Sequence, residues 1–353
     1  MSGPTPAIVL GGTGYVAGEL LRLIAAHPRL EVAAILSDSQ PGAPVADAFA
    51  HLRFAYPDLK FAAPDEINAV IRREPVSALF SAAPHGVSAA IVDRLLATAA
   101  AAGTRVHCVD ISADFRYASQ AAYEAVYKHT HGAPARIREF TCAVPEHLQK
   151  SPTPHVAHPG CFATATLLAS VPLLALGLTD TRLFVTGITG STGSGRKPVE
   201  STHHPHRHSD LYTYGALSHR HVPEIAACAK LATGIEADFN FVPHSGPFAR
   251  GIHVTVQASL KNSLSTAQAL DALQSYYKGC PFVRVAAAAP RVKDVATSNY
   301  ANLSAVSNGN SIAVMSVVDN LNKGAAGGAI QWMNRLLGLA ETTGLTTPAP
   351  GWT

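Results

Sequence analysis

The 353-residue sequence predicts an α/β protein with a doubly wound parallel sheet and a second, α+β domain. A glycine-rich turn joins an apolar segment to an amphipathic one near the N-terminus, and apolar and helical segments then alternate to about residue 116. After about residue 180 strand-like segments predominate. Strands that alternate with helices indicate a parallel sheet. A chain of this length exceeds one compact core, so two domains are expected.

The first βαβ unit is predicted from the N-terminal segment. The apolar stretch 7–10 reads as a strand, the leucine-rich stretch after it as a helix, and Glu31 to Leu36 as a second strand. Glycine has no Cβ, so Gly11, Gly12 and Gly14 let the backbone approach a pyrophosphate that the helix N-terminus then binds. This Rossmann-type arrangement favours dinucleotide binding over an ordinary tight turn.

Further strands end in polar segments. The segments after 76 and 105 read as strands of the same sheet, and they end at Ser81 to His85 and at Ser112 to Arg116. Ligands of such sheets bind at the carboxyl ends of the strands, so these segments should face the cofactor or substrate.

The preferred dinucleotide is not decided by the residues alone. NAD enzymes usually place an acid about 20 residues after the glycines, where Asp38 stands. The neighbouring Ser37 and Ser39 could instead hydrogen-bond a 2′-phosphate. Both NAD and NADP remain open at this point.

Composition excludes several classes of protein. Hydrophobic residues make up 47% and charged residues 14%, and the formal net charge is +3 without a basic run, so nucleic acid is not an expected partner. The longest apolar stretch contains a proline and is too short for a membrane span, and the N-terminus does not resemble a signal peptide. The five cysteines are odd in number and form no C-x-x-C pair. We therefore expect a cytoplasmic protein with no membrane partner.

The stretch "HPGCFATAT" places Cys161 directly after a proline-glycine turn and before helix-forming residues. The N–H groups and dipole of a helix that begins at 161 or 162 would stabilise a thiolate there. A buried, inert cysteine is the alternative, and it suits Cys108 and Cys228 better because they lie within predicted elements.

Two histidines follow in "SHRHVPEI". His219 and His221 precede a helix that Pro223 and Glu224 should open, and a histidine that exchanges a proton near neutral pH is a suitable partner for a thiol. In an extended segment both histidines point the same way, so spacing cannot choose between them. Surface histidines without a catalytic role are the alternative.

Two further loops are candidate ligand-binding segments. The glycine- and serine-rich loop 187–198 could cradle a phosphate or a nicotinamide ribose, or it could be a flexible linker. The segment "STHHPHRHSD" holds four histidines, but no second ligand group stands at a recognised spacing. We therefore predict a solvated loop and no metal.

Seven motifs together resemble one family. They are "GGTGYVAGEL", "DISADFR", "HPGCFATA", "GSTGSGRKP", "HRHVPEI", "FVPHSGPFARGI" and "DNLNKGAAGGAIQWMN". Their order, from about residue 8 to about 337, is similar to that of N-acetyl-γ-glutamyl-phosphate reductase, a relative of aspartate-semialdehyde dehydrogenase. The resemblance implies NADPH-dependent reduction of N-acetyl-γ-glutamyl phosphate to N-acetylglutamate 5-semialdehyde in arginine biosynthesis, through a cysteine thioester.

The resemblance also implies roles for individual residues. Cys161 would be the nucleophile and His219 the acid/base. The remaining matches are the dinucleotide loop (Gly11, Gly12, Thr13, Gly14, Tyr15, with Ser37 and Ser39 beyond it), the nicotinamide site (Ser191, Thr192, Gly193, Asn320) and the substrate site (Arg116, His221, His244, Arg250).

Two positions depart from the family pattern. The third glycine of the dinucleotide loop usually stands where this chain has Ala17, and here it is Gly18. The family often has arginine where this chain has Asp38, which bears on the choice of NADP.

We predict a dinucleotide-binding domain over 1–157 plus 324–353, and a catalytic and oligomerisation domain over 158–323 that forms a homodimer or homotetramer. The alternatives are a related reductase acting on aspartyl phosphate or carrier-bound aminoadipyl phosphate, and a non-catalytic NADP-sensing protein. The paired presence of Cys161 and the "HRH" motif disfavours a sensor, which needs neither.

Overall fold

The structure, a computed structural model, describes residues 3–37 and 39–352, so Asp38 lies outside the described residues. It divides into two compact units. Unit 1 contains the residues up to Cys142, Lys150–His158 and Ala326–Thr346, and unit 2 contains Ala143–Gln149, Pro159–Ala325 and the residues from Thr347 on. The domain limits expected from the sequence stay a prediction.

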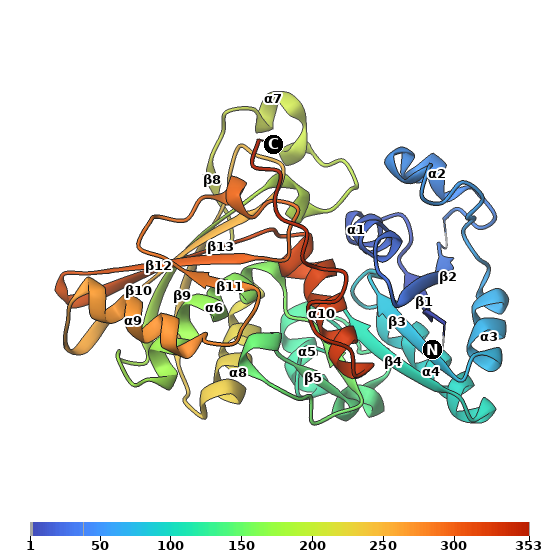
Figure 1. Cartoon of the computed structure of the whole chain (residues 1–353), viewed down its shortest axis with the longest axis horizontal. Helices are drawn as coiled ribbons and strands as arrows, with labels where there is room; N and C mark the ends of the chain where they lie inside the picture. Colours follow the sequence, from blue (N-terminus) through green and yellow to red (C-terminus); the bar gives the residue numbers. More distant parts are fainter. Residues whose placement is uncertain (1–2, 38, 353) are drawn as a thin grey trace. The chain divides into compact units, whose positions relative to one another are not determined.

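Unit 1 is built on a six-stranded sheet in which every recorded strand pair is parallel. Its strand order is β2-β1-β3-β4-β6-β5, and Figure 1 labels β1 to β5 of this sheet. The strands are β1 (Thr5–Leu10), β2 (Leu30–Leu36), β3 (Val76–Ser81), β4 (Arg105–Asp110), β5 (Phe140–Cys142) and β6 (His155–Ala157). The predicted doubly wound parallel sheet is confirmed.

Helices cover both faces of this sheet. Consecutive residues of β1 and β3 are buried, which requires packing on both sides of the strands. α1 contacts α10, whereas α3 contacts α4. The helices of unit 1 are α1 (Tyr15–Ala25), α2 (Val45–Ala48), α3 (Pro64–Arg73), α4 (Ser88–Ala102), α5 (Gln120–Tyr127) and α10 (Gly327–Leu336), with 3₁₀ turns at Ala50–Leu52 and Pro134–Glu139.

Unit 2 is built on a mixed, seven-stranded sheet of order β11-β12-β13-β10-β7-β9-β8, and Figure 1 labels its strands β8 to β13. The β7–β9 and β11–β12 pairs are parallel and the others antiparallel. The strands are β7 (Arg182–Thr189), β8 (Tyr212–Thr213), β9 (Asp238–Ser245), β10 (Ile252–Leu264), β11 (Val283–Val285), β12 (Ala301–Ser307) and β13 (Gly309–Val318). The predicted second α+β domain matches this architecture.

The helix α6 (Cys161–Ala175) is the core of unit 2. It is apolar on all sides, and its residues from Phe162 to Leu174 are buried against β10, β13 and α8. The other helices are α7 (His204–Arg207), α8 (Val222–Thr233) and α9 (Thr266–Tyr276), with 3₁₀ turns at Pro145–His147, Ser191–Ser194, Glu200–Thr202 and Val292–Asp294 and a π-helical turn at Asn322–Ala326. Within 3–37 and 39–352, no helix is long and apolar enough to cross a membrane.

Candidate active site

Cys161 is the first residue of α6, as the sequence predicts. Gly160 is the N-cap and keeps an extended conformation, so the chain turns into the helix at the cysteine. Cys161 is partly exposed, whereas the residues from Phe162 to Leu174 are buried. A cysteine at this position is exposed to the positive end of the helix dipole.

A π-helical turn lies close against Cys161. A Cβ at Gly324 would stand 2.7 Å from the Cβ of Cys161, so this approach requires glycine. The neighbouring Lys323 is fully buried, and its Nζ donates to Glu146 Oε1 at 2.6 Å. Such a buried pair is costly to break because one charge would be left unpaired. The Lys323–Glu146 ion pair therefore fixes the π-helical turn beside the thiol.

Cys161 opens into a cavity of about 510 Å³. The cavity brings together four of the predicted site residues: Cys161, His219, His221 and Gly193. Its other lining residues are Phe162, Thr189, Ser194, Ser201, Tyr212, Tyr214, Gly215, Ser218, Arg220 and Ser245.

Aromatic rings surround His219. Its ring centroid lies 5.9 Å from that of Phe162, 5.4 Å from Phe241 and 5.6 Å from Tyr214, and it meets the His221 ring edge-on at 4.7 Å. Burial lowers the pKa of His219 to about 4, and the nearby Arg220 adds to this effect. His219 is therefore a neutral imidazole near neutral pH.

One nitrogen of His219 is occupied by the backbone. Its Nδ1 accepts a hydrogen bond from the N–H of His221 at 3.2 Å. In a neutral imidazole the other nitrogen, Nε2, must then carry the proton. The expectation of an extended segment is wrong, because residues 220 and 221 form a turn. His221 is the N-cap of α8, as the position of Pro223 predicts.

Tyr214 is a cavity residue that the sequence analysis missed. Burial, followed by the charge of Cys161, raises the pKa of its phenol above the ordinary value. It therefore stays protonated and can donate a hydrogen bond inside the cavity. The signal available in the sequence was a tyrosine five residues before the histidine motif, which is weak by itself.

The glycine- and serine-rich loop is held in place rather than flexible. Ser191 N–H and Thr192 N–H donate to the carbonyl oxygens of Phe248 and Ala249 at 2.9 and 3.0 Å. A Cβ at Gly190 would stand 2.5 Å from the Ala249 oxygen, so the two segments pack directly. These bonds present Gly193 and Ser194 to the cavity.

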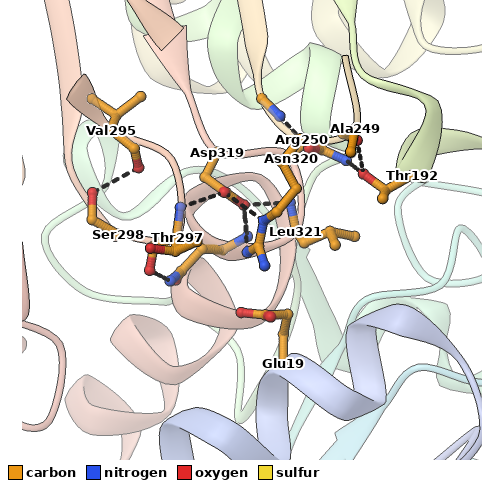
Figure 2. Close-up of polar contacts among 12 residues, drawn as sticks. Glu19, Thr192, Ala249, Arg250, Val295, Thr297, Ser298, Asp319, Asn320 and Leu321 are labelled. Atoms are coloured by element: carbon orange, nitrogen blue, oxygen red, sulfur yellow. Dashed lines mark hydrogen bonds and ion pairs between the residues drawn. The ribbon is translucent and has the colours of Figure 1, made fainter. Parts of the chain in front are cut away.

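Asp319 organises the segment around Asn320 (Figure 2). Its carboxylate accepts two hydrogen bonds from Arg250, at 2.8 and 3.0 Å, and others from the backbone N–H groups of Thr297, Leu321 and Asn322. Arg250 therefore points to Asp319 in unit 2, and it does not line the cavity of Cys161.

Asn320 braces the neighbouring loop. Its Oδ1 accepts from Gly251 N–H at 2.7 Å, and its Nδ2 donates to Thr192 Oγ1 at 3.0 Å (Figure 2). This contact connects two residues that the family resemblance assigns to the nicotinamide site.

His244 lies beside the cavity wall without lining it. It is in β9, where its register partners are Ile188 of β7 and Thr213 of β8. The next residue, Ser245, lines the cavity in its place. The Nδ1 of His244 is buried and has no hydrogen-bond partner among the described residues.

The predicted dinucleotide loop in unit 1 has the tight geometry that it requires. Gly11 has φ +79°, and a Cβ there would stand 2.2 Å from the Ala82 oxygen. Gly12 is also crowded, and Gly14 is the N-cap of α1. Thr13 lies in the turn between β1 and α1, and Tyr15, the first residue of α1, is exposed.

Three other features of unit 1 bear on the predicted sites. Ser37 Oγ lies 3.3 Å from Ser39 Oγ. The buried Arg116 donates to the backbone oxygens of Ile111 and His158 at 2.7 and 3.0 Å, so it supports the strand end and the residue before Pro159. Gly18 lets α1 pack on Phe49, because a Cβ there would come within 2.7 Å of the ring.

The four-histidine segment is mostly exposed around α7. Within residues 3–37 and 39–352 there is no group of three or more His, Cys, Asp or Glu side chains placed to hold a metal ion.

Two family models match the chain. Residues 6–140 match the semialdehyde dehydrogenase NAD-binding domain, and residues 161–320 match the semialdehyde dehydrogenase dimerisation domain. The chain belongs to the semialdehyde dehydrogenase family. It is therefore an oxidoreductase with a domain for a nicotinamide dinucleotide.

Within the semialdehyde dehydrogenase family, the chain is similar to curated proteins named N-acetyl-γ-glutamyl-phosphate reductase. The chain is 40% identical to the N-acetyl-γ-glutamyl-phosphate reductase of Azotobacter vinelandii, over 97% of this chain and 98% of that protein. It is 38% identical to the enzyme of that name from Pseudomonas aeruginosa, over the same shares. The resemblance predicted from the seven motifs is confirmed.

Solved structures share the fold. The aspartate semialdehyde dehydrogenase II of Vibrio cholerae covers 95% of this chain and 98% of its own, with a TM-score of 0.68 and 16% identity. A probable aspartate-semialdehyde dehydrogenase from Pseudomonas aeruginosa, with the same shares covered, gives a TM-score of 0.66 at 17% identity. At these identities the likeness concerns the fold alone.

Proposed function

We propose that this semialdehyde dehydrogenase reduces N-acetyl-γ-glutamyl phosphate to N-acetylglutamate 5-semialdehyde, in arginine biosynthesis, with Cys161 as the nucleophile. One observation carries the proposal: Cys161 begins the buried helix α6 and opens into a cavity that it shares with His219 and Tyr214. A cytoplasmic location follows from the same role, since a reducing compartment keeps a nucleophilic thiol unoxidised.

The chemistry divides into an acylation and a reduction. The thiolate of Cys161 attacks the acyl carbon, the carbon–oxygen bond to the phosphate breaks, and the departing phosphate takes up the one proton that the reaction consumes. The product is a thioester on Cys161. The nicotinamide dinucleotide, when bound, supplies the hydride that reduces this thioester. The carbon–sulfur bond of the thiohemiacetal then breaks, which releases the aldehyde and regenerates the thiolate.

The residues of the cavity stabilise charge on the carbonyl oxygen. Neutral His219 donates from Nε2, and Tyr214 donates from its phenol, when negative charge develops on this oxygen. The family motifs imply that Arg116, His221, His244 and Arg250 bind the substrate anion, and of these His221 lines the cavity of Cys161.

The residues of unit 1 fit a dinucleotide. Gly11 lets the loop pack directly on the Ala82 backbone, and from there the loop to Tyr15 leads into the N-terminus of α1, whose N–H groups can bind a phosphate group. We assign NADPH as the preferred form, since Ser37 and Ser39 stand together after β2 and their hydroxyls can bind a 2′-phosphate. Steady-state kinetics with both dinucleotides tests this, and equal or better efficiency with NADH rejects it.

A homodimer or homotetramer is proposed through the sheet of unit 2. The side chain of Phe184 is 54% exposed on β7, and that of Val306 is 49% exposed on β12. They line a groove of about 460 Å³ with residues of β10 and β13. Phe184→Glu should lower the molar mass measured by light scattering. An unchanged mass would place the subunit interface elsewhere.

The decisive assay measures phosphate-dependent NADP reduction with N-acetylglutamate 5-semialdehyde, beside aspartate semialdehyde. The proposal expects turnover with the first substrate and at least about a hundredfold lower kcat/KM with the second. Preference for aspartate semialdehyde would favour the related reductase. Dinucleotide binding without turnover would favour a sensor. Cys161→Ser should lose turnover and keep dinucleotide binding.

A further inference from the structure

Glu224 is a buried acid beside the proposed nucleophile. It belongs to the first turn of α8 and has no exposed surface. Its Oε1 accepts a hydrogen bond from the N–H of Gly160 at 2.5 Å. Gly160 is the N-cap of α6 and directly precedes Cys161. The mechanism above makes no use of this carboxylate.

The carboxylate lies at the start of two helices. It is in the first turn of its own helix α8, and it binds the residue that caps α6, which packs against α8. The positive ends of both helix dipoles stabilise a negative charge at this place. A hydrogen bond from a backbone N–H to a carboxylate is short and strong. These interactions offset the cost of burying the charge.

The Glu224–Gly160 hydrogen bond links the two segments that carry the proposed catalytic side chains. His219 precedes Glu224 by five residues on the approach to α8, and Cys161 follows Gly160 on α6. A bond between Glu224 and Gly160 therefore fixes the segment that carries the imidazole relative to the helix that carries the thiol.

We propose that Glu224 is a positioning residue that holds Cys161 and His219 in register and restrains ionisation of the thiol before substrate binds. The inference rests on the proposed nucleophilic role of Cys161.

The restraint has an electrostatic cause. A thiolate at Cys161 and the Glu224 carboxylate would both lie at the positive, N-terminal end of the α6 dipole. The two negative charges would therefore repel each other, which disfavours the thiolate. The other charged or titratable side chains of the cavity are Tyr212, Tyr214, His219, Arg220 and His221. The turn packed against the thiol adds the buried Lys323, which is paired with Glu146. Arg220 and Lys323 are the cations of this set, and they act in the opposite direction.

Two substitutions separate position from charge. The amide oxygen of Glu224→Gln still accepts the Gly160 N–H, so the geometry is kept while the charge is lost. Iodoacetamide should then alkylate Cys161 about tenfold faster at pH 7, with the midpoint of the pH dependence lower by about one unit. Turnover should stay within about threefold of the wild type, because the register is kept.

Glu224→Ala removes the contact itself. We expect kcat to fall at least about tenfold while the KM for the dinucleotide is unchanged, because the loss concerns the alignment of thiol and imidazole. Glu236→Gln is the matched control, since it removes an exposed carboxylate shortly after the same helix. It should change neither readout. Alkylation is read at Cys161 by peptide mass spectrometry, and thermal melting reports the folding of each variant.

The outcomes are distinguishable. An unchanged alkylation profile in Glu224→Gln, or a wild-type kcat in Glu224→Ala, overturns the role of Glu224. If Glu224→Gln lowers kcat as much as Glu224→Ala does, the positioning role is also overturned, because the glutamine amide keeps the contact with Gly160. Turnover by Cys161→Ser instead overturns the proposed function, whatever the Glu224 variants do.

Discussion

The backbone N–H of His221 donates to the Nδ1 of His219 at 3.2 Å, and it thereby sets which nitrogen of His219 carries the proton. Since burial lowers the pKa of His219 to about 4, the imidazole is neutral and its Nε2–H is a donor near neutral pH. The two histidines of the motif thus differ in role. In the proposed mechanism the side chain of His219 enters the chemistry, whereas the backbone of His221 orients it.

The first prediction compares the two histidines. His219→Ala should lower kcat about a hundredfold, a typical contribution of one donor to charge stabilisation. His221→Ala keeps the backbone N–H, so the tautomer of His219 is preserved and kcat should fall less than tenfold, with a higher KM for the acyl phosphate. Steady-state kinetics on both variants measures this. The reverse order would transfer the chemical role to His221.

The sequence predicts the parts of the site that depend on neighbours along the chain. A proline and a glycine before helix-forming residues place the start of α6 at Cys161, and Pro223 places His221 at the cap of α8. The glycine-rich turn after an apolar strand likewise predicts the β1–α1 loop.

Contacts between distant residues leave no such local signal. Glu224 and Gly160 are separated by 64 positions, and the need for glycine at 324 follows from a side chain far earlier in the sequence. The strand β12 likewise has a weak local signal, because its asparagine and alanine residues have low strand propensity. Its pairing with β13 decides its conformation.

The second prediction concerns Tyr214. Tyr214→Phe keeps the ring and removes the hydroxyl that can donate within the cavity, so kcat should fall at least about tenfold while dinucleotide binding is unchanged. Tyr212→Phe is the matched control, because Tyr212 lines the same cavity. If the two substitutions lower kcat equally in a kinetic assay, the Tyr214 hydroxyl donates no specific hydrogen bond in the reaction.

The third prediction links stability to pH through His155. Burial lowers the pKa of this side chain to about 4, from 6.5 in an unfolded chain. Between these values the unfolded chain binds more protons, so His155 destabilises the fold as pH falls from 6.5 towards 4, and its effect is absent above that window. His147 acts in the same direction, its pKa also being lowered to about 4 by burial.

The test uses thermal melting at pH 7 and pH 5. The uncharged side chain of His155→Gln cannot titrate, so its melting temperature should fall less between the two pH values than that of the wild type. Asp110 acts in the opposite sense, since burial raises its pKa to about 6, but it is present in both proteins. An equal fall in the wild type and the variant would contradict the prediction.

The fourth prediction concerns Asp319. Its fully buried carboxylate accepts five hydrogen bonds, from Arg250 and from three backbone N–H groups. Asp319→Asn leaves Arg250 without its ion pair and should lower the free energy of unfolding by about 3 kcal/mol. Denaturant titration measures this. In contrast, Asp294→Asn breaks an exposed pair with Arg291 and should cost far less than the Asp319 substitution. Similar costs for both would mean that the Asp319 network adds little.

The last prediction tests the dinucleotide loop with two glycines of nearly equal φ. Gly11 has φ +79° and Gly42 has φ +77°, so alanine at either position must adopt a positive φ, at a cost of about 1 kcal/mol. A Cβ at Gly42 meets nothing within 4 Å, whereas a Cβ at Gly11 overlaps the Ala82 backbone and forces the loop to move. Gly11→Ala should therefore raise the dissociation constant of NADPH at least about tenfold, and Gly42→Ala should leave it unchanged. Fluorescence titration of the bound dinucleotide measures both constants. If the two variants bind NADPH equally well, the turn between β1 and α1 does not hold the pyrophosphate.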